Sequence, residues 1–359
     1  MSSTSTRYDS WLTDDDGPAA IVIREQLMPV EGEDGVLFPA TFASGDKFEG
    51  GYNVDGDPNG RNVCLIDSVG SQANRIEPLF SKPKYAGLVP QIVVKAGERT
   101  VNLLDAGHRA GDAVVRCTAL QKSVQDAFKA SLRGNTEPLA KIAPTSLVFG
   151  VWDSRDTQAK LPRLIASTIR AFDVRKLTRS AQFVPAIEYV DNELLEEPAD
   201  KAAREAYAVR GFVHVPASAS HGGVVATGGI RRDATLSLAA LRLLSVDSDE
   251  GRTLALRRYI LGLALIALTF RPSSYLRQGC NLVLNPDKPG EYVEVFGDGR
   301  RVPAKLTHDD ALEFAKDAAA AFGVGPDQSV EFDRELAKRD VQSDKSVDDK
   351  APRKSKKKS

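Results

Sequence analysis

Four polar side chains near the start of one predicted helix have the chemistry to bind an anion. The apolar run Val63–Ile66 predicts a short buried strand, and the chain passes directly from it into a helix. Apolar residues at helical spacing turn one side of that helix toward the core: Val69, Ala73, Ile76 and Phe80. Ser71, Asn74 and Arg75 point away from this stripe, and Gln72 lies on its flank. Backbone N–H groups and the helix dipole already favour phosphate at such a position. An ordinary amphipathic helix is the alternative, and the helix taken alone fits that description better.

Residues with guanidinium and hydroxyl groups directly follow two later elements that are predicted to be buried. Ser146–Trp152 predicts a buried strand, which Ser154 and Arg155 follow. Gly251–Phe270 predicts a long helix, and the loop Arg271-Pro-Ser-Ser-Tyr-Leu-Arg277 comes after it. Such side chains contact phosphate in nucleic-acid complexes. A surface salt bridge is the alternative for each arginine, and only the recurrence of this chemistry at three element ends favours nucleic acid.

Arginines are concentrated in two stretches, although the formal net charge of the chain is only −1. The first stretch, 155–179, includes a helix predicted from Pro162 to about Phe172, with Arg163 on its polar face. The second stretch, 231–277, begins with Arg231 and Arg232. A polyanion site must therefore be local, built from these arginines rather than from bulk charge.

The sequence lacks the motifs of common enzymes and metal sites. The histidines (His108, His214, His221 and His308) share no ligand spacing, and the cysteines (Cys64, Cys117 and Cys280) have no CxxC pattern. No Walker loop, dinucleotide fingerprint or nucleophile elbow is present. The most apolar run, Tyr259–Phe270, is too short to span a membrane, and no secretory segment precedes it. We expect a cytoplasmic protein with no membrane partner, no cofactor, no metal and no enzymatic activity.

The order of predicted elements favours an α+β fold. Strands are expected at 21–27, 281–284 and 292–296, and further helices at 119–132, 201–207 and 309–322. A long Gly/Asp/Pro-rich excursion covers 28–61, and a second out-and-back excursion covers 180–229. From Asp333 the chain is charged and free of aromatic residues, which predicts a disordered tail with a basic end. A βαββαβ core with long insertions is the natural arrangement.

Two of these motifs resemble a known family. Asp67-Ser-Val-Gly-Ser-Gln-Ala-Asn-Arg-Ile-Glu77 after a strand, followed later by Ser146-Leu-Val-Phe-Gly-Val-Trp-Asp-Ser-Arg155, is similar to the backbone (Cas-seven family) subunit of CRISPR Cascade complexes. The resemblance is strongest to type I-G, formerly I-U, and covers residues 20 to about 300. The loop Pro272-Ser-Ser-Tyr-Leu-Arg277 replaces a Lys-Gln pair of better-known relatives, which leaves the role of Arg277 open.

The resemblance implies an RNA-recognition-like (ferredoxin-like) palm over 20–332, after an N-terminal segment 1–19 and before the tail 333–359. A finger-like insertion would cover about 28–61 and a thumb-like insertion about 180–229. Copies would stack as a helical filament along a guide RNA (crRNA), presenting it to target DNA in an antiviral ribonucleoprotein. A large subunit and a guide-processing or capping subunit would be further partners.

The resemblance also implies roles for individual residues. Ser71, Gln72, Asn74 and Arg75 would hold phosphates at the helix start, and Trp152 or His221 would contact a base or sugar. The remaining candidates would line the RNA groove: Arg155, Arg163, Arg231, Arg232, Arg271 and Arg277. Type I members of the family are not nucleases. A metal-dependent endoribonuclease acting through Asp46 or Asp67, as in type III relatives, is the alternative, and a structural protein that binds only other proteins is a weaker one.

Overall fold

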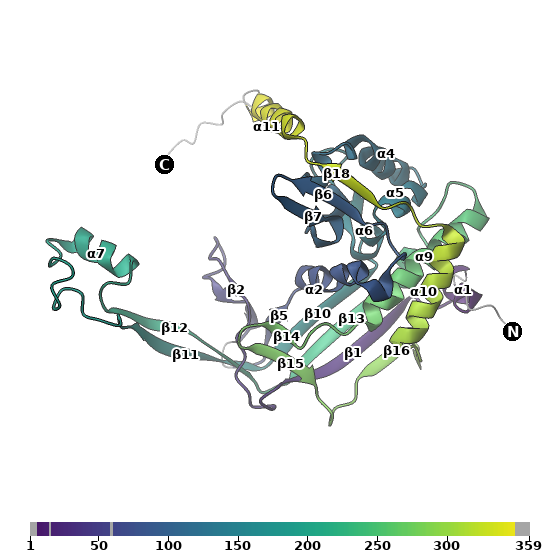
Figure 1. The fold of residues 1–359 in the computed structure, drawn as a ribbon. Coiled ribbons are helices and arrows are strands. Elements are labelled where there is room, and N and C mark those ends of the chain that lie inside the picture. Colours follow the sequence, from purple (N-terminus) through teal and green to yellow (C-terminus); the bar gives the residue numbers. More distant parts are fainter. Residues whose placement is uncertain (1–5, 14–15, 58–59, 349–359) are drawn as a thin grey trace, which may run out of the picture.

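The computed structural model describes residues 6–13, 16–57 and 60–348, which form a body with a long projecting arm (Figure 1). The main sheet of the body has the order β14–β15–β1–β13–β10–β5–β4, with β16 also on β1 and β17 on β16. Its strands are β1 (Ala20–Pro29), β4 (Val54–Gly56), β5 (Asn62–Asp67), β10 (Ile165–Phe172), β13 (Ile230–Ser237), β14 (Tyr275–Arg277), β15 (Cys280–Leu284), β16 (Glu291–Val295) and β17 (Arg301–Pro303). Every pairing within this sheet is antiparallel.

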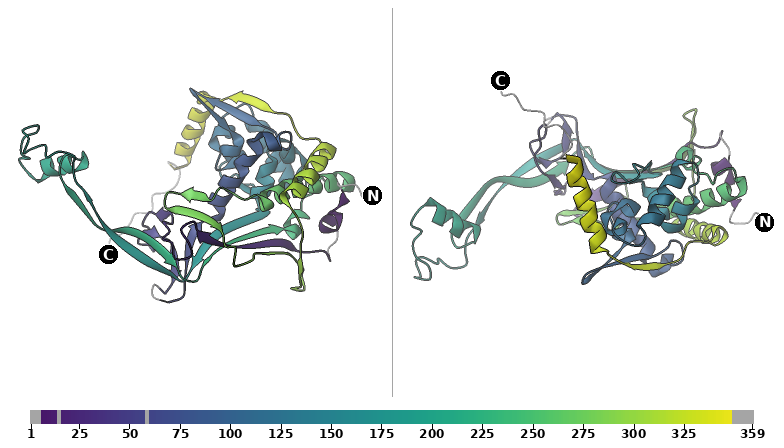
Figure 2. Two further views of the ribbon diagram at one scale, coloured as in Figure 1. Left: turned by 60° about the horizontal axis from the view of Figure 1, so that its bottom comes forward. Right: turned by 90° about the horizontal axis from the view of Figure 1, so that it is seen from above.

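Helices cover one face of the main sheet and leave the other face open (Figures 1 and 2). They are α1 (Asp9–Thr13), α2 (Val69–Ile76), α3 (Ala113–Arg116), α4 (Gln121–Leu132), α5 (Glu137–Ile142), α6 (Pro144–Phe149), α8 (Leu238–Leu241), α9 (Glu250–Thr269) and α10 (His308–Phe322). The centre of this layer is α9, which is buried from Tyr259 to Leu268. Gly262 permits its close packing on α10, because a Cβ there would lie 2.8 Å from the Ala315 Cα. Within the described residues, no helix is long and apolar enough to cross a membrane.

The projecting arm is a hairpin of β11 (Val174–Phe183) and β12 (Val215–Ala226), with α7 (Lys201–Val209) at its tip. It joins β10 to β13 and includes most of the excursion predicted as a thumb. The excursion predicted as a finger contains the short pair β2 (Thr41–Phe42) and β3 (Gly51–Tyr52). Leu37 from this excursion pairs with Val224, so the bases of finger and arm pack together.

Smaller elements complete the body. A three-stranded sheet consists of β18 (Gln328–Glu331), β6 (Ile92–Ala96) and β7 (Arg99–Asn102). A short ribbon pairs β8 (Val151–Trp152) with β9 (Lys160–Leu161). The 3-10 helices Glu77–Ser81 and Pro83–Tyr85 continue the chain beyond α2, with Pro78 in the first turn of the former.

Two predicted elements are wrong in type. Ser146–Trp152 was expected to be a strand, but most of it lies in α6. Pro144 starts that helix, and Gly150 ends it at a φ of +77°. The helix expected from Pro162 to Phe172 is instead β10, whose alternate residues Ser167, Ile169 and Ala171 are buried. Short apolar runs do not distinguish a strand from a buried helix, which explains both errors.

The segment expected to be a disordered tail begins as a helix, α11 (Arg334–Asp348). The Asp333 carboxylate accepts hydrogen bonds from the backbone of Glu335 and Leu336, as an N-cap does. Asp340 also pairs with Arg116 of the body at 2.7 Å. The basic end of the chain, 349–359, lies outside the described residues.

Candidate nucleic-acid interface

A buried aspartate brings together side chains from α2 and from the loop after α9. Asp67 ends β5, and its side chain is 0% exposed. Its Oδ2 accepts hydrogen bonds from Gln72 Nε2 at 2.6 Å and Arg75 Nε at 3.2 Å. Its Oδ1 accepts from Arg277 Nη2 at 2.9 Å. Two guanidinium groups therefore share one buried carboxylate.

A second carboxylate, Glu25 of β1, joins two more arginines. Its Oε2 lies 2.6 Å from Arg232 Nη1, and its Oε1 lies 3.6 Å from Arg271 Nε. Arg232 is 4% exposed, whereas the side chain of Arg271 is 71% exposed. Arg232 is thus a buried structural partner, and Arg271 is held only by a loose ion pair at the surface.

Ser167 of β10 connects the two carboxylates through hydrogen bonds. Its hydroxyl donates to Gln72 Oε1 at 3.0 Å and accepts from Arg232 Nε at 3.1 Å. A continuous polar network therefore runs from Glu25 to Asp67 beneath the helices. We call its four arginines, Arg75, Arg232, Arg271 and Arg277, the arginine cluster.

Strand alternation separates two neighbouring arginines that the sequence placed in one groove. Arg232 shares the buried side of β13 with Ile230, Ala234 and Leu236. Arg231 lies on the opposite side, 2.8 Å from Asp233 and over the ring of Phe172. Arg231 therefore belongs to the open face of the sheet and not to the arginine cluster.

The arginine cluster also holds the loop after α9 in place. Arg75 Nη2 donates to the carbonyl of Leu276 at 2.7 Å, and Arg277 Nη1 donates to the carbonyl of Ile66 at 2.9 Å. These bonds tie β14 to β5 and α2. Both guanidinium groups remain partly exposed, so they combine a structural contact with a positive surface.

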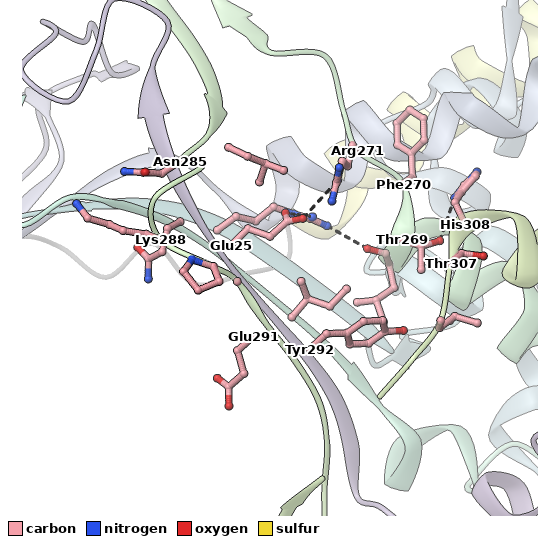
Figure 3. Close-up of a pocket in the computed structure, with 18 of the residues that line it drawn as sticks. Glu25, Thr269, Phe270, Arg271, Asn285, Lys288, Glu291, Tyr292, Thr307 and His308 are labelled. Carbon is pink, nitrogen blue, oxygen red and sulfur yellow. Dashed lines mark hydrogen bonds and ion pairs between the residues drawn. The ribbon is translucent and has the colours of Figure 1, made fainter. Parts of the chain in front are cut away.

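Two cavities meet at Arg271. One has a volume of about 410 Å³ and the other about 830 Å³, and both are lined by Glu25, Arg232, Arg271 and Leu284. Figure 3 shows the larger cavity, with Arg271 reaching from the end of α9 toward Glu25. Its far side is formed by Phe270, Thr269 and the start of α10 (Figure 3).

A hydrogen-bonded chain orders the far side of the larger cavity. Thr269 Oγ1 lies 2.7 Å from the carbonyl of Leu265, to which it donates, and 2.9 Å from His308 Nδ1. His308 Nε2 lies 2.8 Å from the Tyr85 hydroxyl. Because Thr269 already donates its proton, these bonds are satisfied when Nδ1 carries the imidazole proton and Tyr85 donates to Nε2. Burial lowers the pKa of His308, and Lys84 lowers it further, so the neutral ring is favoured.

The structure assigns different environments to the predicted site residues. Arg75 and Arg277 are partly exposed beside Asp67 and Arg271 is exposed beside Glu25, whereas Gln72 and Arg232 are buried with their polar atoms engaged inside the protein. Gln72 was predicted to hold phosphate and Arg232 to line the RNA groove; both side chains are buried, line the smaller cavity and make their hydrogen bonds within the protein. Asn74 is exposed, and the backbone N–H of Ser71 donates to the N-cap Ser68.

The other predicted residues lie outside the arginine cluster. Trp152 is exposed on the β8–β9 ribbon with Lys160 over its ring, and Arg155 and Arg163 are exposed near it in the chain. His221 of the arm packs against Tyr52 of the excursion 28–61, with ring centroids 4.9 Å apart and the ring planes tilted by 44°. Arg155 and Arg163 were predicted to line the RNA groove, and Trp152 or His221 to contact a base or sugar; these roles stay predictions.

Two members of the network were missed from the sequence, Glu25 and Ser167. Glu25 shares its side of β1 with the buried Ile21 and Ile23, so an acidic residue at that position signals a buried cationic partner. Ser167 carried no comparable signal, since its segment was assigned to a helix. Asp67 was considered only as a metal ligand, and it holds two arginines instead.

Comparison with known proteins matches part of the chain to a family. Residues 21–176 match the family described as CRISPR-associated protein GSU0053, a range that includes β1, β5, α2 and β10. No curated protein matches the chain. The family match supports a CRISPR-associated protein.

Proposed function

We propose that this chain is a non-catalytic, guide-RNA-binding backbone subunit of a type I-G CRISPR interference complex. Two observations carry the proposal together: the partly exposed guanidinium groups of Arg75 and Arg277 share Asp67, and the exposed Arg271 lines both cavities. Guanidinium groups bind phosphates and tolerate any base sequence, as a holder of variable guides requires. The family match supports the CRISPR setting.

The strand order supports an RNA-recognition-like palm. We number the four core strands in chain order: β1 is first, β10 second, β13 third, and β15 or β16 fourth. Across the sheet they then lie in the order fourth, first, third, second. A helix layer follows β1 and α9 follows β13, as in a βαββαβ unit. In this reading β5 is an additional strand, the excursion 28–61 is the finger, and the arm is the thumb.

The arm supports assembly of several copies along the RNA. None of the residues of α7 is buried, and Val209 is 86% exposed. A tip of this kind buries apolar surface only against another molecule. Contact between the arm of one copy and a different surface of the next is heterologous, which produces an open filament. The guide would then be presented to target DNA, with a large subunit and a guide-processing subunit at its ends, in the cytoplasm.

The proposal includes the absence of nuclease activity. Asp46, the candidate for a type III-like ribonuclease, is exposed in the turn between Gly45 and Phe48. Labelled complementary RNA incubated with the purified complex and Mg²⁺ should remain intact. Cleavage that disappears in Asp46→Ala would replace the proposal with the ribonuclease alternative.

Reversal of one exposed charge tests RNA binding. Arg271→Glu should strongly reduce the guide RNA that co-purifies with the protein, because it repels phosphate at the cavity mouth while leaving the buried pairs of Asp67 intact. Arg99→Glu makes the same change on exposed β7 and should retain the RNA. If the two variants were equally stable to heat and co-purified with equal amounts of RNA, the assignment of Arg271 to the RNA-binding site would be wrong.

A further inference from the structure

The smaller cavity beside Arg271 has a mainly aliphatic wall. Its volume is about 410 Å³, which is within the range of small-ligand sites. The apolar members come from β1, β10, β14 and β15 and from the loop after α9, and they include Leu27, Ile169, Pro272, Leu276, Leu282 and Leu284. A hollow of this size and lining suits a flat organic ring.

The polar side chains at the floor of this cavity are already used within the protein. Gln72 donates to Asp67 and accepts from Ser167. Arg232 donates to Ser167, to Glu25 and to the carbonyl of Leu268. A ring that enters therefore meets few free donors or acceptors that could read its edge.

The mouth of the cavity carries surplus positive charge. Two arginines, Arg232 and Arg271, line this cavity with one carboxylate, Glu25. Arg271 is the least constrained, because its Nε lies 3.6 Å from Glu25, beyond a normal hydrogen bond. An anion at the mouth would provide Arg271 with a better partner. An aromatic ring joined to an anion is the chemistry of a nucleotide.

We propose that this cavity receives one nucleobase of single-stranded RNA, with the adjoining phosphate at Arg271, and that it accepts any base. The inference deepens the proposed function and rests on it. A pocket whose polar groups are internally satisfied holds a base by burial of its apolar surface, which depends little on sequence. A free mononucleotide has the same chemistry, but a strand adds phosphates that reach Arg75 and Arg277.

Binding of short RNA strands with and without bases tests the cavity. An oligouridylate short enough to contact one copy should bind about tenfold more tightly than an abasic strand of equal length, measured by fluorescence anisotropy at fixed salt. Oligoadenylate and oligocytidylate should bind within about threefold of oligouridylate. Equal binding of the abasic strand would overturn the base pocket, and a strong preference for one base would overturn its indifference to sequence. Uridine monophosphate that competes as well as the strand would identify a mononucleotide site instead.

A variant that fills the cavity tests the same assignment, and the chain offers a matched control for it. Leu284 is partly exposed at the rim, so Leu284→Trp should fold and should remove the difference between base-bearing and abasic strands. Leu243→Trp adds the same ring at an exposed position that lines neither cavity, and it should preserve the difference. Retention of the difference in Leu284→Trp would contradict the assignment. If neither strand binds the native protein, the proposed function fails, whereas equal binding of both strands removes only the base pocket.

Discussion

The body and the tip of the arm differ in how far their side chains are buried and paired within the chain. In the body, α9 is buried from Tyr259 to Leu268, and even charged groups such as Asp67 and Arg232 have partners within the chain. At the tip of the arm, α7 has no buried residue, and Val209 and Leu194 are exposed. The difference indicates that the body is specified by its own contacts, whereas the arm tip leaves apolar side chains exposed, which the proposed assembly would bury.

Breaking the buried network should have the largest effect on stability. Asp67→Asn removes the buried negative charge that the partly exposed Arg75 and Arg277 share. The free energy of unfolding should fall by about 1.5–3 kcal/mol, the usual contribution of hydrogen bonds to a charged group. Urea unfolding followed by circular dichroism measures the change.

Asp233→Asn is the control for that loss. Asp233 pairs with Arg24 and Arg231 on the open face of the sheet, where it is partly exposed. Its replacement should cost about 0–1 kcal/mol. If the two variants were equally stable, the body would not depend on its buried network in the way described.

Charging the arm tip should separate assembly from stability. Val209→Asp should change the free energy of unfolding by less than about 0.5 kcal/mol, because the side chain is exposed, yet it should reduce the number of copies in the complex. Val341→Asp makes the same change on exposed α11 and should assemble normally. Light scattering of the RNA-loaded proteins measures copy number. Normal assembly of Val209→Asp would show that this part of the tip makes no contact.

The smallest effect concerns the pH dependence of the body. The pKa of His308 is lowered below its ordinary 6.5 in the folded protein, so the unfolded chain binds the proton more readily. The contribution of His308 to stability is therefore present above pH 6.5 and declines as the pH falls. His308→Gln should flatten this decline in stability, as measured by urea unfolding between neutral and acidic pH.

The other titratable groups near the ring are the same in both proteins. Tyr85, Lys84 and Asp309 surround the ring in the native protein and stay unchanged in the variant. Glu77, whose pKa burial raises to about 7, titrates in both proteins and cancels in the difference. Parallel pH profiles would contradict a neutral His308.

Local patterns in the sequence predicted much of the body correctly. The strand at Val63–Ile66, the long helix at Gly251–Phe270 and the helix at 309–322 are all present in the structure, because each is long or strongly patterned. β10 was missed because Leu164, Ile165, Thr168 and Ile169 fit a helical stripe as well as a strand. Their β-branched content favours the strand, and pairing with β5 and β13 decides it.

The partners of the arginines could not be predicted from local patterns. Arg277 and Asp67 are 210 residues apart in the chain, and Arg232 and Glu25 are 207 apart. Only the folded sheet brings them together, so the arginines appeared to be available for phosphate when several of them are structural. Arg271 is a predicted residue whose side chain stays exposed in the structure, so the proposal of RNA contact rests on it most.

The mass of the complex tests the central claim most directly. The protein co-expressed with a guide RNA should appear in native mass spectrometry as several copies bound to one RNA, and Arg271→Glu should shift the population toward RNA-free protein. Such a result would support a subunit that polymerises along a guide. A single copy free of nucleic acid, from native protein that unfolds cooperatively in urea, would contradict the account.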